Sequence, residues 1–243
     1  MSIIYDLYKK IGKEPCPPGT IRVERCALNL NPNSEDIVTS NVFGLLKLLH
    51  PKLWLERILT HVYGERSFAS LSYDQFSIEF WKIFRPPLIT AYRTWISEVD
   101  IVIQLLHFIL MVETKYRSTI QKENPRKGTR DQVIRYLDLL AYHYYSCNFK
   151  DVYFLLVTND SNEPQLLTNY RDPKEIEPGL SKIRPHVDYK SISTALAHNL
   201  GWISWKAVLQ ILEEMRSTVN LHFSEEKIIE QLILYLKFKF RKV

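Results

Sequence analysis

The chain of 243 residues is 46% hydrophobic and 24% charged, contains seven Gly and twelve Pro, and carries a formal net charge of +5 at pH 7. These values are typical of a globular chain and exclude collagen-like and low-complexity proteins. The mildly basic charge permits an anionic partner without identifying one, because the local clustering of charge matters more than its sum.

The sequence carries no signal for secretion or for a membrane span. Its first twenty residues lack the continuous apolar core of a signal peptide, and the longest apolar run, residues 101–112, is interrupted by polar side chains and is too short to cross a bilayer. The three cysteines form no CxxC pair, which favours reduced thiols over a disulfide framework. We therefore expect a cytoplasmic protein without a membrane role.

The first elements predicted along the chain are an irregular leader and two helices. Residues 1–33 contain Pro-Pro and Pro-Gly pairs, which exclude helix where they occur. Ser34 is a suitable N-cap, acidic residues follow it, and apolar residues then recur at helical spacing. Pro51 divides this stretch into two helices, and the second is expected to end near Gly64.

A strand-rich segment comes next. One or two strands are expected within residues 67–95, leading into the apolar run EVDIVIQLLHFILMVETKY at residues 98–116. Its halves, EVDIVIQ and HFILMVETKY, are rich in β-branched and aromatic residues and predict an antiparallel hairpin. A basic loop, the helical pattern RDQVIRYLDLLAYHYYSC and the buried strand VYFLLVTND follow. Strand, helix and strand in this order imply a mixed sheet with a crossover helix.

The C-terminal third is expected to add helices. The segment after Asp160 is rich in turn residues and is expected to wrap the surface, whereas SISTALAHNLGWISWKAVLQILEEMRSTV and SEEKIIEQLILYLKFKF each have the pattern of a helix. We therefore predict an α/β fold with a central mixed β-sheet flanked by helices. It would comprise a leader (1–33), a core (34–160) and a C-terminal loop and helical extension packed on the core (161–243).

Charged residues at the margins of the apolar run form a candidate site. Residues two apart in a strand share a face, so Glu113 and Lys115 project together while Thr114 turns away. Hairpin pairing can bring Asp100 alongside Glu113. Two carboxylates and an ammonium on one face are typical of a Mg²⁺ site that activates a water and neutralises charge on a phosphate. Glu98 shares the face of Asp100, either as a further ligand or as a solvated residue.

This order of residues resembles the PD-(D/E)XK nuclease superfamily. In that superfamily an Asp on one strand and a (D/E)xK motif on the next hold a metal ion in an α/β core. Asp100 and the Glu113-Thr114-Lys115 tripeptide match the pattern, with hydrophobic flanks IVI and ILMV. Val99 departs from it, because it stands where the name-giving Pro would be.

Two further stretches are similar to elements of the same enzymes. Gln132 and Tyr136, in DQVIRY at the start of the crossover helix, resemble the QxxxY element of RecB-like members. From its position alone, Tyr136 is expected to be a packing residue with its hydroxyl at the rim. Members of the superfamily usually place a Glu on the first core helix. Glu35 in SEDIVTSNVFGLL is the first choice for it, and Glu56 in LWLERIL is the rival.

The resemblance implies a restriction-endonuclease-like core over residues 34–160 and the activity of a Mg²⁺-dependent deoxyribonuclease, expected to be an endonuclease, in which Mn²⁺ can replace Mg²⁺. It implies that the metal is held by Asp100 and Glu113. The residues to which it assigns roles in catalysis are Asp100, Glu113, Lys115, Glu35 and Gln132.

A basic loop lies between the ExK strand and the crossover helix. Its position next to the proposed metal site favours contacts with phosphates, which position a nucleic acid without reading its sequence. The residues expected to make these contacts are Lys122, Arg126, Lys127 and Arg130. The expected partner is therefore DNA. Homodimerisation stays open, because cutting both strands often needs two sites.

Plainer interpretations of the same residues stay open as well. An ExK tripeptide is common by chance, so these charges can be solvated strand ends. The fold can also serve as a non-catalytic module that binds nucleic acid or protein through the basic loop and the C-terminal KFKFRKV. The sequence lacks GxxxxGK[ST], HxH and HExxH spacings, which argues against intrinsic ATP-driven activity and against a zinc site.

Overall fold

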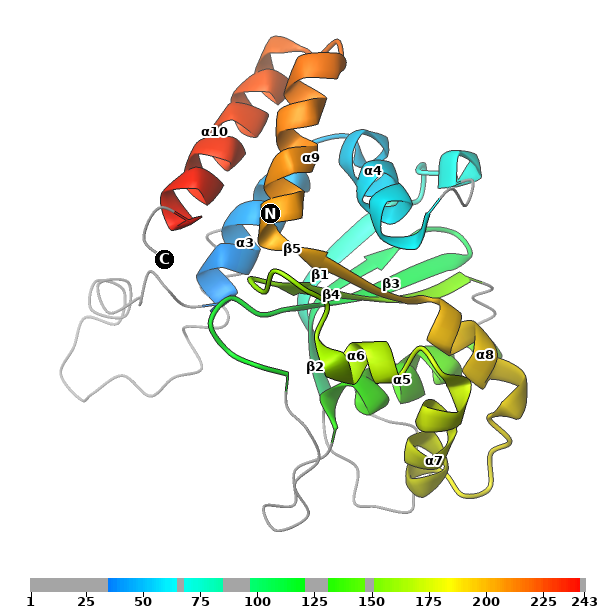
Figure 1. The fold of residues 1–243 in the computed structure, drawn as a ribbon. Coiled ribbons are helices and arrows are strands. Elements are labelled where there is room, and N and C mark those ends of the chain that lie inside the picture. Colours follow the sequence, from blue (N-terminus) through cyan, green and yellow to red (C-terminus); the bar gives the residue numbers. More distant parts are fainter. Residues whose placement is uncertain (1–34, 65–67, 85–96, 121–130, 147–150, 241–243) are drawn as a thin grey trace, which may run out of the picture.

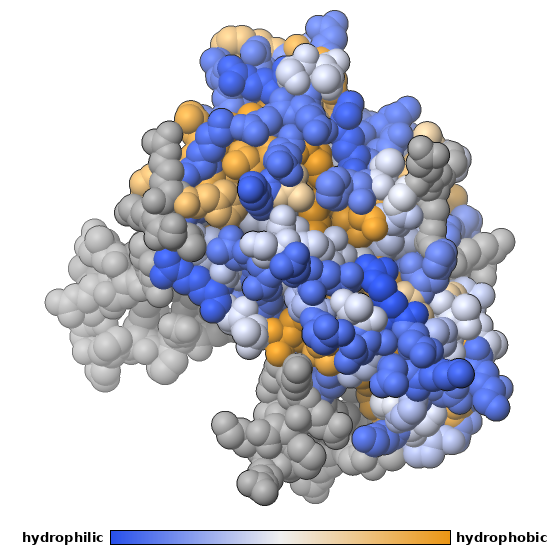
Figure 2. All heavy atoms as spheres, viewed as in Figure 1, coloured by the Kyte–Doolittle hydropathy of each residue, from blue (hydrophilic) through white to orange (hydrophobic). Residues whose placement is uncertain are grey.

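The structure is a computed structural model that describes residues 35–64, 68–84, 97–120, 131–146 and 151–240. The predicted leader, the N-cap Ser34 and the basic loop with Lys122, Arg126, Lys127 and Arg130 lie outside the described residues. None of the helices that the structure describes is long and apolar enough to cross a membrane. On the face seen in Figure 2, hydrophilic side chains cover much of the described surface.

The described residues form a five-stranded mixed sheet with strand order β1-β2-β3-β4-β5. Its strands are β1 (Ser77–Phe84), β2 (Ser97–Gln104), β3 (Phe108–Thr114), β4 (Asp151–Thr158) and β5 (Leu200–Ser204). Strand β2 is antiparallel to both of its neighbours, β1 and β3, whereas β3, β4 and β5 run parallel to one another. The predicted α/β fold with a central mixed sheet is confirmed, and so is the antiparallel hairpin of β2 and β3.

Helices cover both faces of this sheet (Figure 1). One layer consists of α3 (Glu35–Leu46), α4 (Pro51–Tyr63), α9 (Trp205–Thr218) and α10 (Phe223–Phe240). The opposite layer consists of α5 (Gln132–Ser146), α6 (Gln165–Asn169), α7 (Pro173–Ile183) and α8 (Lys190–His198). A short 3-10 helix, Phe68–Ser70, follows α4. The sheet is therefore the middle of three layers.

The central strand β3 shows why its sequence is almost continuously apolar. All of its residues are buried. Leu110 and Val112 pack into the core beneath α3, α4, α9 and α10, while Ile109 and Met111 pack into the core beneath α5. A strand covered on both faces needs apolar side chains at every position rather than at alternate ones. The charged end of β3 is the exception, and it marks the candidate site.

Proline and glycine bound helix α4 as the sequence predicts. Pro51 occupies its first turn, where the missing backbone N–H leaves no hydrogen bond unmade, and His50 Nδ1 accepts a hydrogen bond from the Lys52 amide (3.3 Å). The helix ends at Gly64, whose φ of +79° lies in the region that favours glycine. The division of the N-terminal stretch at Pro51 is thereby confirmed.

The C-terminal third differs from its prediction in one important element. Residues 191–219, predicted as one helix, form the end of α8, strand β5 and α9. The prediction was wrong because the strand depends on contacts remote in sequence. Leu200 to Ser204 pair with β4, and a Cβ at Gly201 would lie 2.4 Å from Val62 and 2.6 Å from the Tyr63 ring. Only a glycine lets the end of α4 lie this close to β5.

Two other C-terminal predictions have different outcomes. The segment after Asp160, expected to be turn-rich, forms α6 and α7, and α7 buries Ile176 and Leu180 despite Pro178 within it. The last predicted helix is confirmed as α10. Because β5 joins the sheet and α9 and α10 share the core beneath α3, residues 161–240 complete the same layers to which the N-terminal elements belong.

Candidate metal centre

The hairpin of β2 and β3 changes its hydrogen bonding next to Asp100. Regular pairing ends at Ile101 opposite Val112, so one residue further Asp100 comes opposite Glu113. There the Thr114 amide donates to Asp100 Oδ2 (2.9 Å), and the Thr114 hydroxyl donates to the same oxygen (2.9 Å). A carboxylate therefore takes the place of a main-chain acceptor at the end of the hairpin.

The neighbouring strand is also irregular at this point. Phe80 and Lys82 of β1 pair with β2 on either side of Asp100, while Trp81 between them has a φ of +49°. A non-glycine residue in this region carries backbone strain, and such residues concentrate at functional sites. Trp81 therefore lies opposite Asp100 on the neighbouring strand.

Glu113 is held by the crossover helix α5. Its side chain faces α5 and the residue is 2% exposed. Gln132 Nε2 donates to Glu113 Oε1 (2.5 Å), and the Tyr136 hydroxyl donates to Oε2 (2.5 Å). Gln132 and Tyr136 lie one turn apart on the same face of the helix. Burial and the nearby Glu113 raise the pKa of Tyr136 well above its ordinary value, so this hydroxyl stays a donor.

Lys115 lies just beyond β3, where its ammonium bridges two carboxylates. Its Nζ is 2.6 Å from Glu113 Oε1 and 2.9 Å from Glu35 Oε1. Burial alone would lower the pKa of Lys115, but the two carboxylates, Glu113 foremost, hold that pKa above its ordinary value. The ammonium therefore stays charged over the physiological pH range.

Glu35 reaches this cluster from the first turn of α3, on the opposite side of the sheet from α5. Besides Lys115, its carboxylate accepts hydrogen bonds from the Tyr116 amide (3.3 Å) and from the Ser118 hydroxyl. The segment after β3 thus wraps around the Glu35 side chain. Glu56, the rival for this role, lies elsewhere: it lines a groove of about 630 Å³ between α4 and α9.

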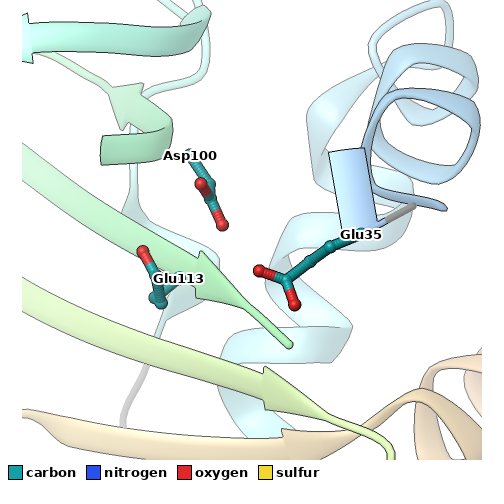
Figure 3. Close-up of side chains that lie close together, drawn as sticks. All are labelled: Glu35, Asp100 and Glu113. Carbon is teal, nitrogen blue, oxygen red and sulfur yellow. The ribbon is translucent and has the colours of Figure 1, made fainter. Parts of the chain in front are cut away.

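Three carboxylates converge at the end of β3 (Figure 3). One oxygen from each of Glu35, Asp100 and Glu113 lies within 4.8 Å of the other two. Oxygens that share a Mg²⁺ ion at about 2.1 Å lie roughly 3–4 Å apart, so small side-chain movements would close this set on an ion. The carboxylates meet between the two helical layers, not on one face as the strand spacing predicts, because Asp100 bonds to Thr114 while Glu113 faces α5.

The environment of Asp100 favours its protonated form. Burial, followed by the charge of Glu113, raises the pKa of Asp100 to about 7, against the opposing effects of Thr114 and Lys115. The Thr114 hydroxyl also lies 2.5 Å from the Thr39 hydroxyl, which is 2.8 Å from the Glu35 carbonyl oxygen. A bound cation would instead favour the carboxylate.

The structure brings together some of the site residues that the sequence predicts and does not describe the others. Glu35, Asp100, Glu113, Lys115 and Gln132 are brought together, whereas the cations of the basic loop fall outside the described residues. Carboxylate oxygens are the hard ligands that Mg²⁺ prefers, so the donor set fits this ion.

Some contacts of the site were not predicted from the sequence. Tyr136, expected at the rim, is 1% exposed and donates to Glu113. Glu98 was weighed as a further ligand, but its contact with the site is made by its carbonyl oxygen, which lies 3.1 Å from the Tyr136 hydroxyl. Thr39 was missed, although its position one helical turn after Glu35 was a usable signal.

Comparison with protein-family models, with curated proteins and with solved structures finds no match to this chain. The resemblance to PD-(D/E)XK nucleases accordingly stays a prediction from the sequence motifs, and a function has to be argued from the geometry of the site.

Proposed function

We propose that this protein is a metal-dependent nuclease that hydrolyses phosphodiester bonds of DNA. The observation that carries the proposal is the convergence of three carboxylates, from α3, β2 and β3, around the ammonium of Lys115. Carboxylates that are held close together and partly shielded from water repel one another, so a fold gains no stability by gathering three of them beside a single amine. The sequence resemblance to PD-(D/E)XK nucleases supplies DNA as the substrate class.

Each residue of the cluster has a distinct role in this proposal. Asp100 and Glu113 would hold Mg²⁺, with Glu35 as a further direct or water-mediated ligand. When bound, the ion would supply a Lewis acid that activates water and neutralises charge on the phosphate. Lys115 lies beside the carboxylates, within reach of a water or a phosphate oxygen at the same place, and would stabilise the negative charge that develops there. Gln132 keeps Glu113 oriented.

One observation favours a second candidate, a non-catalytic binding module. Lys115 pairs with both Glu35 and Glu113, as a purely structural ion pair would. Such a module would bind DNA in a salt-sensitive manner without divalent ions. Its binding would also persist in the Asp100→Ala variant.

A cleavage assay distinguishes the two candidates. Supercoiled plasmid and linear duplex DNA are incubated with the full-length protein in Mg²⁺, in Mn²⁺ and in EDTA. The nuclease proposal expects cleavage only with a divalent ion, and cleavage of the plasmid identifies an endonuclease. Lys115→Ala should reduce it by about a hundredfold, whereas Lys206→Ala, which removes an exposed lysine on α9, should cut like the wild type. Intact DNA under every ion, or undiminished cutting by Lys115→Ala, would overturn the proposal.

A further inference from the structure

A chain of buried hydroxyl groups connects α3 to the hairpin that carries the acidic cluster. Thr39 of α3 is 1% exposed and Thr114 of β3 is fully buried. The Thr39 hydroxyl lies 2.8 Å from the Glu35 carbonyl oxygen and 2.5 Å from the Thr114 hydroxyl, which donates to Asp100 Oδ2 (2.9 Å). Helix α3 and the β2–β3 hairpin, which are far apart in the sequence, are thereby joined through these hydroxyl groups.

The position of Thr39 within α3 gives this connection its consequence. Glu35 and Thr39 lie one turn apart on the same face of the helix, so a shift of α3 would move both. Val38, Val42 and Phe43 of this helix make apolar contacts with the core. The other polar contacts near its first turn are made through the long side chain of Glu35, which can adjust without moving the helix. Apolar packing is not directional, whereas a hydrogen bond between buried groups fixes both a distance and an angle. The hydroxyl contact is therefore suited to set the place of the first turn of α3.

We infer that Thr39 is a positioning residue of the acidic cluster. Through Thr114 it fixes the first turn of α3, and with it the Glu35 carboxylate, relative to Asp100 and Glu113. Thr39 touches neither the expected ion nor the substrate, so its effect is exerted through the residues that do. The inference rests on the proposed function where it concerns metal affinity. Where it concerns the placement of α3, it rests on the hydrogen bonds alone.

The next residue of the same helix provides a matched control. Ser40 is 3% exposed, and its hydroxyl donates to the Ile37 carbonyl oxygen within α3 (3.3 Å). Removing this hydroxyl in Ser40→Ala tests the general effect of deleting a buried hydroxyl from α3. Thr39→Val keeps the shape of the side chain and removes the link to Thr114. Thr39→Ser keeps the hydroxyl and loses only a methyl group.

The experiment measures metal binding and local stability on the full-length proteins. Calorimetric titration with Mn²⁺ should give Thr39→Val an affinity lower by about tenfold to a hundredfold, which is the usual loss when a residue that orients metal ligands is removed. Thr39→Ser should bind Mn²⁺ within about threefold of the wild type, because its hydroxyl restores the link, and Ser40→Ala should bind like the wild type. Wild-type affinity in Thr39→Val, or an equal loss in Ser40→Ala, would overturn the inference.

Amide hydrogen exchange, measured without metal, separates this inference from the proposed function. Thr39→Val should speed exchange in residues 35–43 and 114–118, where the first turn of α3 meets the segment that holds Glu35, and Thr39→Ser should not. A wild type that binds no Mn²⁺ would contradict the proposed function and the metal-affinity part. Unchanged exchange in Thr39→Val would contradict the positioning role itself, whatever the metal result.

Discussion

Helix α5 contributes to one buried and one partly buried polar cluster, and the two differ in how their charges balance. In the first, Asp138 receives two hydrogen bonds from Arg184, from Nε (2.6 Å) and from Nη2 (2.8 Å), and one from the Tyr189 hydroxyl (2.9 Å). One carboxylate meets one guanidinium, and Asp138 and Arg184 are both buried. This cluster ties α5 to the segment between α7 and α8, and its charges cancel.

In the second cluster, three carboxylates share one ammonium. Glu113, held by α5, meets Asp100 and Glu35, while Lys115 pairs with Glu113 and Glu35. A balanced buried pair needs no further partner, but surplus carboxylates remain costly until a proton or a cation compensates them. The comparison teaches that the surplus of negative charge, rather than burial or hydrogen bonding as such, distinguishes a candidate functional cluster from a structural one in this fold.

The largest expected effect comes from removing a carboxylate of the unbalanced cluster. Glu113→Gln keeps the shape and one of the two acceptor oxygens that face Gln132 and Tyr136, but it removes a charged metal ligand. We expect DNA cleavage to fall by about a thousandfold, since the charge that holds the ion and stabilises the transition state is lost. Measured by urea unfolding without Mg²⁺, the free energy of unfolding of Glu113→Gln should be no higher than that of the metal-free wild type. Undiminished cleavage in this variant would contradict the distinction between the clusters.

The matching change in the balanced cluster should act on stability instead. Asp138→Asn leaves the Arg184 guanidinium buried without its counter-charge, which should lower the free energy of unfolding by about 3–5 kcal/mol. The extra stability that Mg²⁺ confers, measured by urea unfolding with and without the ion, should stay as in the wild type. If Asp138→Asn removed that Mg²⁺ effect, the two clusters would not be separable.

Replacing Lys115 should have a smaller effect, which lowers DNA cleavage but raises the affinity for a metal ion. In Lys115→Met the ammonium no longer competes with a metal ion for Glu35 and Glu113. Cleavage should fall by about a hundredfold, while the affinity for Mn²⁺ measured by calorimetry should rise. Lys206→Met on the exposed face of α9 is the control and should change neither quantity. A Lys115→Met protein that binds Mn²⁺ more weakly would show that Lys115 is not the competitor.

The smallest expected effect is a dependence of stability on pH that originates at Asp100. Its pKa is raised to about 7 from an ordinary value of 3.8, so between these values the native state binds a proton that the unfolded chain does not. The contribution of Asp100 to the free energy of unfolding is therefore fully present below about pH 4 and is lost as the pH rises through 7.

Comparison with Asp100→Asn isolates this contribution from other titrating groups. Without metal, the stability of the wild type relative to Asp100→Asn should decrease between pH 4 and pH 7, as followed by urea unfolding. Saturating Mg²⁺ should counteract the decrease in the wild type only, because the ion favours the ionised carboxylate. A stability difference that is flat with pH would mean that Asp100 titrates normally.

The sequence was most informative where local pattern determines structure. The run from Glu98 to Tyr116 predicted the hairpin because its β-branched residues and its length suit two strands. Pro51 and Gly64 predicted the ends of α4 because proline has a fixed φ and lacks an N–H, whereas glycine adopts a positive φ without strain. Strand β5 could not be predicted in this way, because the helical patterns on both sides of it make its own short pattern indistinguishable from helix. Its conformation is determined by pairing with β4 and by the close approach of Tyr63 to Gly201.

The candidate site was likewise predictable only where local sequence pattern determines it. The period of two in a strand identified Glu113 and Lys115, and motif order suggested Asp100, Glu35 and Gln132. The irregularity of β2 and β1 at Asp100 and Trp81 was not predictable, because it arises from how two strands meet. For the same reason the sequence did not indicate that the carboxylates converge between the helical layers.

The central claim is that a divalent cation binds among Glu35, Asp100 and Glu113. The most direct measurement is a crystal structure of the protein soaked in Mn²⁺, with the anomalous signal of the ion recorded. The account predicts a peak coordinated by oxygens of these carboxylates, with Lys115 displaced from at least one of them. A fully soaked crystal without a peak at this place, and with Lys115 still bridging Glu35 and Glu113, would contradict it.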